Sequence, residues 1–201
     1  MFFLKEREAI NYSMTKYQKV VKRFFDFLLS LILIPILLFP LFVLITIATI
    51  DLRVFGLFCQ KRIGKYGKEF TIFKIKTLKK DKKTTKISKF FRKSKLDELP
   101  QIFNVFLGNM SFVGPRPDLK EVIFQTIEID DIILSIKPGI TGPASLYFFN
   151  EEDILSKVEN SIEYNLTVIQ PKKNKINRDY INNYHIFNDI KIIFKTLKNV
   201  I

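Results

Sequence analysis

Two adjacent carboxylates, Asp97 and Glu98, are the residues of this sequence best suited to chemistry. They lie where Leu96, Leu99 and Phe103 begin to recur at helical spacing, so we expect them at the start of a helix. Neighbouring side chains project about 100° apart on a helix, which allows one carboxylate to attack while the other holds a cation. A carboxylate is a competent covalent nucleophile, and its attack on a phosphoryl group requires Mg²⁺, Lys or Arg to neutralise the charge that it approaches.

A structural role for Asp97 is the alternative. Ser94 and Asp97 have the spacing of a capping box, in which two side chains satisfy the first free amides of a helix. The helix dipole also favours acidic residues near a helix N-terminus. Taken alone, the pair favours a helix cap over a nucleophile.

Two rigid loops further along the chain favour a catalytic role for Asp97 over a helix cap. The segment 108–117 (GNMSFVGPRP) holds Arg116 between Pro115 and Pro117, and the two prolines fix the backbone on either side of it. A rigidly presented guanidinium suits bidentate recognition of a phosphate. A second loop, 137–143 (KPGITGP), could bring backbone amides close to a ligand, and it also suits a structural turn.

An uncharged apolar run from Phe27 to Ile50 directs the chain to a membrane, because it exceeds the roughly 20 residues that a spanning helix needs. Pro35 and Pro40 interrupt the run, and proline breaks or bends a helix because it lacks an N–H and clashes with the preceding turn. Basic residues flank both ends, whereas the positive-inside rule places them on the cytoplasmic side only: Lys16, Lys19, Lys22, Arg23, Arg53, Lys61, Arg62, Lys65 and Lys68. Two forms stay open, a re-entrant helix that returns to the same face and a kinked single span.

The remaining chain suits one compact domain. Residues 51–201 match the usual domain size of about 100 to 200 residues, after a polar lead-in at 1–18 and the membrane helix at 19–50. A net charge of +13 and a pI of 9.7 indicate an anionic partner, and the apolar run favours anionic lipid or a phosphorylated substrate over nucleic acid. Cys59 and His185 are each alone, which excludes a disulfide framework and a Cys/His zinc site within one chain.

The expected fold class is α+β. Alternating segments at 57–63 and 69–75, joined by a turn at 65–67, predict a small β-hairpin. An exposed loop at 79–86 is followed by an amphipathic helix at 87–93. At 184–201, apolar residues on one helical side with lysines beside them fit an interfacial helix or a helix docked on the domain.

Several stretches of the chain resemble the bacterial sugar transferases, the small monotopic phosphoglycosyl transferases. The resemblance runs from residue 22 to 197, in the family's order, through 22–26 (KRFFD), 60–64 (QKRIG), 73–77 (FKIKT), 96–105 (LDELPQIFNV), 111–117 (SFVGPRP) and 138–142 (PGITG). It implies an enzyme on the cytoplasmic face of the bacterial inner membrane, with a re-entrant membrane helix, that starts a glycan on undecaprenyl phosphate.

The resemblance also implies roles for individual residues. Asp97 would attack the β-phosphate of a UDP-sugar, release UMP and hold a phosphosugar until undecaprenyl phosphate accepts it. Glu98 and Asp97 would bind Mg²⁺. Lys76, Arg92 and Arg116 would lie around the phosphates, where cations stabilise a crowded anionic transition state.

The sequence departs from the family pattern at several places, among them the linker 51–56, which lacks the usual Pro-Gly-Pro turn. Phe39 precedes Pro40 where a serine is common, and Phe39 cannot satisfy a carbonyl freed by proline as a hydroxyl can. Asn109 replaces a common aspartate, which would weaken metal binding if that aspartate supports the metal. The segment 143–145 (PAS) replaces a frequent Trp-Ala-Gln, and we look for sugar selectivity there.

Two alternatives to this enzyme follow from the same residues. One is a membrane-anchored basic adaptor that binds anionic lipid or nucleic acid without catalysis, and the other is a folded but inactive member of the family. No recognised nucleic-acid motif is present, so nucleic acid is not an expected partner. An adaptor should not need Asp97, so this residue separates the hypotheses.

Overall fold

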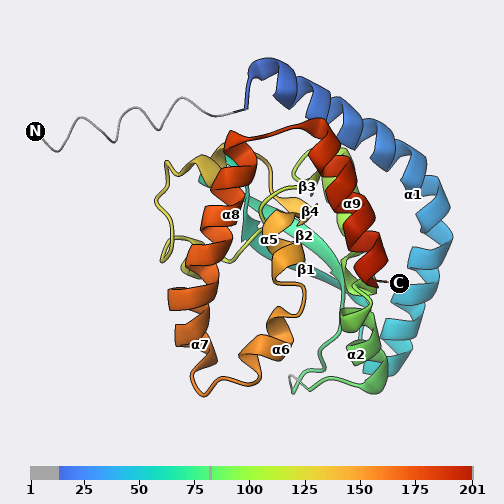
Figure 1. The fold of residues 1–201 in the computed structure, drawn as a ribbon. Helices are drawn as coiled ribbons and strands as arrows, with labels where there is room; N and C mark the ends of the chain where they lie inside the picture. The colour runs from blue at the N-terminus through green and yellow to red at the C-terminus, as the bar shows by residue number, and fades with distance from the viewer. Residues whose placement is uncertain (1–13, 82, 201) are drawn as a thin grey trace, which may run out of the picture.

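The computed structural model describes residues 14–81 and 83–200. The first helix, α1 (Lys16–Leu52), precedes a hairpin of β1 (Leu57–Ile63) and β2 (Glu69–Ile75), as Figure 1 shows. A second pair of strands, β3 (Ser111–Val113) and β4 (Gly139–Thr141), lies among helices that are mostly short. These helices are α2 (Lys86–Lys93), α3 (Gln101–Leu107), α4 (Lys120–Ile123), α5 (Pro143–Tyr147), α6 (Glu151–Leu155), α7 (Ser161–Tyr164), α8 (Gln170–Asn182) and α9 (Ile186–Val200). The predicted α+β class is confirmed.

The hairpin has the predicted bounds, and its register places functional side chains on one face. β1 and β2 pair antiparallel, with Phe58 opposite Lys74 and Arg62 opposite Phe70. Side chains two residues apart on a strand share a face, so Phe58, Gln60 and Arg62 lie on the same face as Lys74. The turn between the strands contains Tyr66 and Gly67 at φ 59° and 70°, a left-handed conformation that favours glycine.

The loop at 137–143 is structural, because its backbone pairs with the loop that carries Arg116. β3 and β4 form a parallel pair, and the amide of Gly139 donates to the carbonyl of Pro115 at 2.8 Å. A Cβ on Gly139 would collide with the backbone nitrogen of Gly114. The Gly139 amide is therefore engaged, and the alternative of ligand-binding amides is not realised at this position.

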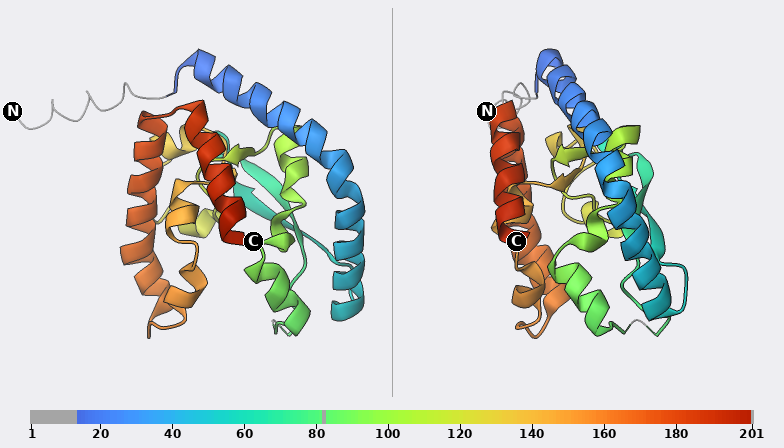
Figure 2. Two further views of the ribbon diagram at one scale, coloured as in Figure 1. Left: turned by 45° about the vertical axis from the view of Figure 1, so that its right-hand side comes forward. Right: turned by 90° about the vertical axis from the view of Figure 1, so that its right-hand side faces the viewer.

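Helix α1 begins at Lys16, three residues before the predicted start, because Thr15 and Gln18 form a capping box. It is continuous to Leu52 with Pro35 and Pro40 inside, so the predicted interruption takes the form of a bend, visible in Figure 2. It is long and apolar enough to cross a membrane, and only 11% of its most apolar 18-residue window is buried. The core helix of a soluble protein would be covered instead.

The first turns of α1 are joined to the domain by buried polar contacts. Lys22 pairs with Asp189 of α9 at 2.5 Å, and Asp26 accepts hydrogen bonds from the hydroxyl of Ser111 and the amide of Phe112, each at 3.0 Å. Arg23 donates to the carbonyls at the end of α3, those of residues 105 and 106. Lys22 and Arg23, which the sequence places among the basic residues that flank the apolar run, therefore contact the domain.

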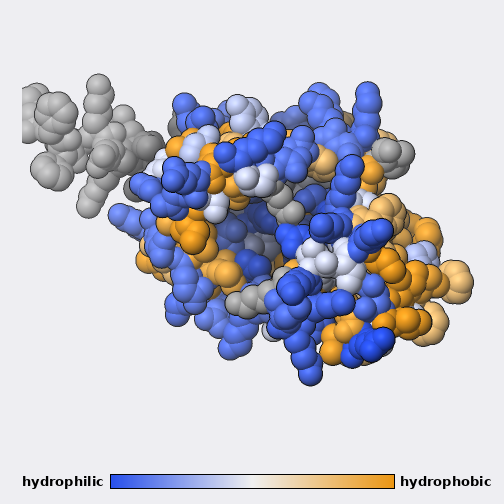
Figure 3. All heavy atoms as spheres, turned by 90° about the horizontal axis from the view of Figure 1, so that it is seen from below, coloured by the Kyte–Doolittle hydropathy of each residue, from blue (hydrophilic) through white to orange (hydrophobic). Residues whose placement is uncertain are grey.

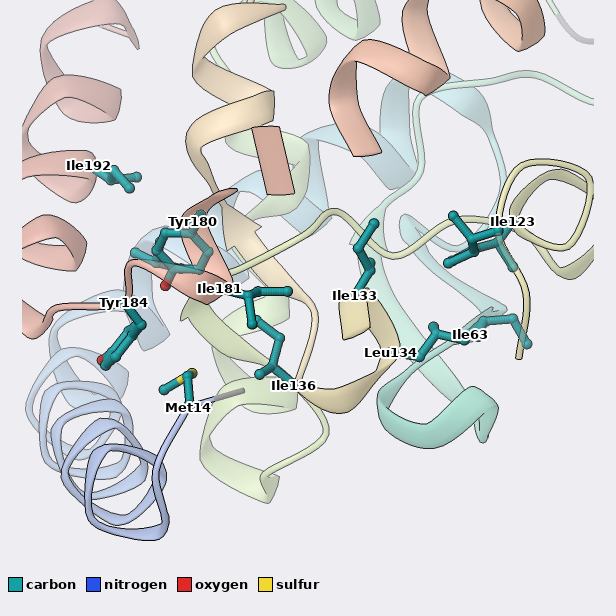
Figure 4. Packing of buried hydrophobic residues seen from close by; sticks show 12 residues of the cluster. Met14, Ile63, Ile123, Ile133, Leu134, Ile136, Tyr180, Ile181, Tyr184 and Ile192 are labelled. Carbon is teal, nitrogen blue, oxygen red and sulfur yellow. The ribbon is translucent and has the colours of Figure 1, made fainter. Parts of the chain in front are cut away.

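Three hydrophobic clusters hold the elements together. The largest joins β1, β3, α8 and α9 with the segment before α1, as Figure 4 shows for Ile63, Ile181 and Ile192. A second packs Ile72 of β2 against Val105 and Met110. The third joins Ala48 near the end of α1 to Ile75 and Phe91. The hairpin is thus fixed between α1, α2 and α3.

The last helix combines both arrangements that its sequence pattern allowed. Asp189 and Ile192 are buried against the domain, so α9 is docked. Phe187, Phe194 and Leu197 are exposed along its other side, as an interfacial helix requires.

Candidate active site

Asp97 and Glu98 lie on a tight turn immediately before α3. The turn is a 3₁₀ helix over Leu96–Glu98, preceded by Lys95 at φ 53°. An α-helix cannot continue through it, because Pro100 has no N–H to donate to the carbonyl of Leu96. The amide of Leu99 donates to that carbonyl instead, at 3.3 Å. The expected helix start is therefore a 3₁₀ turn, and α3 begins at Gln101.

The predicted cap of Ser94 and Asp97 is wrong. The Ser94 hydroxyl donates to the carbonyl of Phe90 at 2.7 Å, one turn back in α2. In the part of the chain that the structure describes, no side chain caps the 3₁₀ turn. Asp97 is only 9% exposed, and its Oδ1 has no hydrogen-bond partner among the described residues. A buried carboxylate oxygen without a partner is costly, so Asp97 is placed for something other than stability.

Glu98 is held firmly by two cations. Arg116 binds it with both terminal nitrogens, Nη2 to Oε1 at 2.5 Å and Nη1 to Oε2 at 3.1 Å. Lys74 donates to Oε1 from β2, also at 3.1 Å. This bidentate arrangement fixes Arg116, whose backbone is already restrained by the adjacent prolines.

The two carboxylates differ in electrostatics as they do in contacts. Burial, with the negative charge of Glu98, raises the pKa of Asp97 from 3.8 to about 6, although Lys74, Lys95 and Arg116 oppose the rise. Burial also acts to raise the pKa of Glu98, but the charges of Arg116 and Lys74 outweigh it and hold that pKa well below its usual value. Neighbouring groups with separated pKa values are typical of functional sites.

Both carboxylates open into a cleft with a volume of about 300 Å³. It is lined by the five residues singled out from the sequence for catalysis and phosphate binding: Asp97, Glu98, Lys76, Arg92 and Arg116. The lower face of the molecule is hollowed, with hydrophilic residues around the hollow (Figure 3). The volume is at the lower end of the range for small-molecule sites, about 300 to 1,000 Å³.

Sequence analysis missed five polar residues of the cleft, one of which, Thr77, directly follows Lys76. Lys74, Arg62 and Gln60 come from the hairpin, and Lys95 comes from the turn before Asp97. The signal was present for the three hairpin residues, because strand alternation puts residues 58, 60 and 62 on one face, and residue 74, which pairs with 58, lies on the same face. These residues make the cleft strongly basic, as binding of a diphosphate requires.

Other residues of sequence interest lie outside the cleft. Pro35 and Pro40 are within α1. Asn109 is exposed and does not line the cleft, and its amide donates to the carbonyl of Asn104 at 2.9 Å. Its position gives no support to a role at the carboxylates. Ser145, from the segment expected to select the sugar, lines a small separate cavity that shares Arg116 with the cleft.

The donor set at Asp97 and Glu98 fits Mg²⁺. The ion prefers oxygen ligands and commonly takes one or two carboxylates, with substrate phosphates and water completing its shell. The unpartnered Oδ1 of Asp97 is such a ligand, whereas both oxygens of Glu98 already accept from Arg116. Among residues 14–81 and 83–200 no group of three or more His, Cys, Asp or Glu could hold a metal by itself, so substrate oxygens would have to contribute.

Comparison with known proteins finds relatives among the sugar transferases. The chain is 34% identical over 195 residues to the UDP-glucose:undecaprenyl-phosphate glucose-1-phosphate transferase of Klebsiella pneumoniae, across 89% of this chain and 39% of that protein. It is 31% identical to a UDP-N-acetylgalactosamine-undecaprenyl-phosphate N-acetylgalactosaminephosphotransferase of Aeromonas hydrophila, across 90% of this chain and 44% of that protein. An uncharacterized sugar transferase of Bacillus subtilis, EpsL, is 30% identical, with 90% of this chain and 88% of that protein covered.

The chain thus spans about two fifths of the length of the first two relatives, and nearly all of the third. Residues 17–201 match the family described as bacterial sugar transferase, a range that includes α1, the cleft and α9. The chain belongs to the bacterial sugar transferase family.

Proposed function

We propose that this protein is a phosphoglycosyl transferase that moves a sugar 1-phosphate from a UDP-sugar to undecaprenyl phosphate and releases UMP. The relatives are named for such transfers, with glucose or N-acetylgalactosamine as the sugar. The observation that carries the proposal is the carboxylate of Asp97, which is buried at a basic cleft with one oxygen unpartnered among the described residues. The transfer would be the first membrane step in the assembly of a bacterial glycan.

The reaction proceeds in two displacements. An oxygen of ionised Asp97 attacks the β-phosphorus of the UDP-sugar, the bond from that phosphorus to the bridging oxygen breaks, and UMP leaves with the electron pair. An oxygen of undecaprenyl phosphate then attacks the phosphorus of the aspartyl phosphosugar. The bond to Asp97 breaks, the carboxylate is restored, and the lipid carries the sugar on a diphosphate.

The cations of the cleft have separate tasks in these steps. Arg116 and Lys74, fixed by Glu98, present positive charge next to Asp97 without needing to reorganise. Lys76 and Arg92 extend the basic surface toward the rest of the diphosphate. Asp97, with Glu98 beside it, would hold Mg²⁺, which would supply positive charge to the phosphoryl oxygens when bound.

We propose a re-entrant topology for α1, with both ends on the cytoplasmic face of the inner membrane. One domain contacts both ends of the helix: Lys22 pairs with Asp189 near its start, while Ala48 packs against Ile75 near its end. Asp51 also accepts a hydrogen bond from the hydroxyl of Thr85 at 2.5 Å. A single span would separate the ends by the bilayer, about 30 Å thick, so these contacts favour a helix that returns. Anionic lipids would then meet the lysines beside the membrane.

The topology is tested with cysteines in a Cys59→Ser background. Lys16→Cys and Lys80→Cys flank the membrane segment, and intact spheroplasts are treated with a membrane-impermeant maleimide. Protection of both until the cells are lysed agrees with the re-entrant form. Labelling of one of the two in intact spheroplasts would establish a single span.

The activity is tested by UMP release from a panel of UDP-sugars, with undecaprenyl phosphate, Mg²⁺ and detergent-solubilised protein. We expect release by the wild type and by Asp153→Asn, a control at an exposed acid of α6, and none by Asp97→Asn. Intact-mass analysis without acceptor should show the phosphosugar adduct on the wild type alone. Release by Asp97→Asn would refute the covalent role, and silence from the wild type beside a working family enzyme would favour the adaptor or the inactive protein.

A further inference from the structure

The lining of the cleft includes two accessible apolar side chains, and the proposed donor chemistry does not account for them. They are Phe58 and Leu78, which are 37% and 38% exposed. Phe58 lies directly opposite Lys74 in the hairpin, so its ring is next to the cation that binds Glu98. The remaining lining of the cleft is mainly polar and basic. The cleft therefore combines an anion-binding part with an apolar part.

Both apolar side chains lie two residues after positions that are hydrogen-bonded at the membrane helix, Gly56 and Lys76. The amide of Gly56 donates to the hydroxyl of Thr49 in the last turns of α1 at 2.9 Å, and the amide of Lys76 donates to the carbonyl of Gly56 at 2.7 Å. Ile75, which also lines the cleft, packs against Ala48 of α1. In Figure 3 apolar residues gather on the side where α1 lies. An apolar chain held in the bilayer beside α1 would reach the cleft at Phe58 and Leu78.

We propose that Phe58 and Leu78 form the acceptor entrance, where the first isoprene units of a polyprenyl phosphate pack while its phosphate lies among the cations near Asp97. This inference rests on the proposed transferase function. An isoprenoid phosphate matches both parts of the cleft, since its head is anionic and its chain is wholly apolar. Side chains at the entrance would gain contact with the lipid only in the second displacement.

The competing occupant of Phe58 is the uracil ring of the donor, because aromatic side chains stack on nucleobases. The two occupants make different demands on the side chain. Packing against isoprene requires apolar bulk, which leucine also supplies, whereas stacking requires an aromatic ring. They also act in different half-reactions, because uracil is bound before UMP leaves and the lipid is bound afterwards.

The test compares Phe58→Ala, Phe58→Leu and Leu78→Ala with two controls of equal exposure outside the cleft, Phe124→Ala and Ile154→Ala, whose side chains are each 36% exposed. The first half-reaction is measured as the burst of UMP without acceptor. The second is measured as the KM for undecaprenyl phosphate and for farnesyl phosphate. Melting temperatures in detergent identify any variant that does not fold, and Leu78→Ala provides an independent test if Phe58→Ala fails.

We expect both alanine variants at the entrance to retain the burst within about twofold and to raise the KM for both lipids about tenfold, equivalent to about 1.4 kcal/mol. Phe58→Leu and the two controls should stay near the wild type. An unchanged KM in both alanine variants would overturn the proposal. Loss of the burst in Phe58→Leu would assign the ring to uracil instead. Absence of a burst in the wild type would reject the transferase function itself, an outcome distinct from either.

Discussion

The ionisation of Asp97 has a cost that unfolding measurements can detect. Its pKa of about 6 in the folded protein exceeds the ordinary value of 3.8, which applies to the unfolded chain. As pH rises, the unfolded chain loses this proton first. The folded state is therefore progressively penalised between about pH 4 and pH 6, and above that the penalty is complete. At about 1.4 kcal/mol per pKa unit, the full penalty is about 3 kcal/mol.

Asp97→Asn removes this penalty, because its amide is neutral at every pH and nearly the same shape as the protonated acid. In EDTA at about pH 8, we expect the variant to be more stable than the wild type by about 3 kcal/mol. For a chain of this size, that raises the melting temperature by about 6 to 12 °C. The advantage should disappear below about pH 4, where the wild-type carboxyl is protonated in both states.

The assay is thermal unfolding in detergent micelles across this pH range, with Asp153→Asn as the matched control. The other acids titrate in both proteins, so the difference between variant and wild type isolates Asp97. If the difference in melting temperature between Asp97→Asn and the wild type is the same at every pH, the reasoning is refuted. A stabilised but inactive variant would show that the buried charge serves catalysis at the expense of the fold.

Three further substitutions test the supporting structure. Glu98→Gln removes the carboxylate that holds Arg116 and Lys74, so we expect a loss of about 3 kcal/mol in unfolding free energy and at least about a tenfold slower UMP burst, measured by chemical denaturation and rapid quench. Lys22→Met leaves Asp189 buried without its cation and should cost about 3 to 5 kcal/mol, part of which Lys22→Met/Asp189→Asn should recover in the same unfolding assay. Gly139→Ala forces β4 away from Gly114 and should lower stability by about 1 to 3 kcal/mol. Unchanged unfolding midpoints would contradict each expectation.

Local patterns predicted the elements whose determinants are local. The hairpin at 57–75 follows from strand alternation around a glycine-bearing turn, and α2 follows from helical periodicity over a few residues. The 3₁₀ turn at Asp97 was also within reach, because Pro100 lies four residues after Leu96 and removes the hydrogen bond that an α-helix needs. The capping-box spacing of Ser94 and Asp97 indicated an α-helix start at this position instead.

Contacts between distant parts of the chain were beyond these patterns. Lys22 was interpreted from its neighbours as a membrane-flanking cation, yet its partner Asp189 lies on the last helix. Arg116 was expected near phosphates, and nothing in its own loop indicates that Glu98 holds it. A local pattern can identify a charged residue, but the fold alone decides which opposite charge it meets.

The pairing of Glu98 gives its neighbour a distinct electrostatic environment. The positive charges of Arg116 and Lys74 are largely neutralised by Glu98, to which both residues are hydrogen-bonded. The negative charge of Glu98 also disfavours ionisation of Asp97. In Glu98→Gln the like charge is gone and both cations face Asp97, so the pKa of Asp97 should fall toward its ordinary value. The stability gained from Asp97→Asn above pH 6 should then shrink toward zero in that background, which a double-mutant cycle measures as a coupling of about 2 to 3 kcal/mol. An undiminished gain would mean that burial alone raises the pKa and that the pairing of Glu98 has no part in preparing the nucleophile.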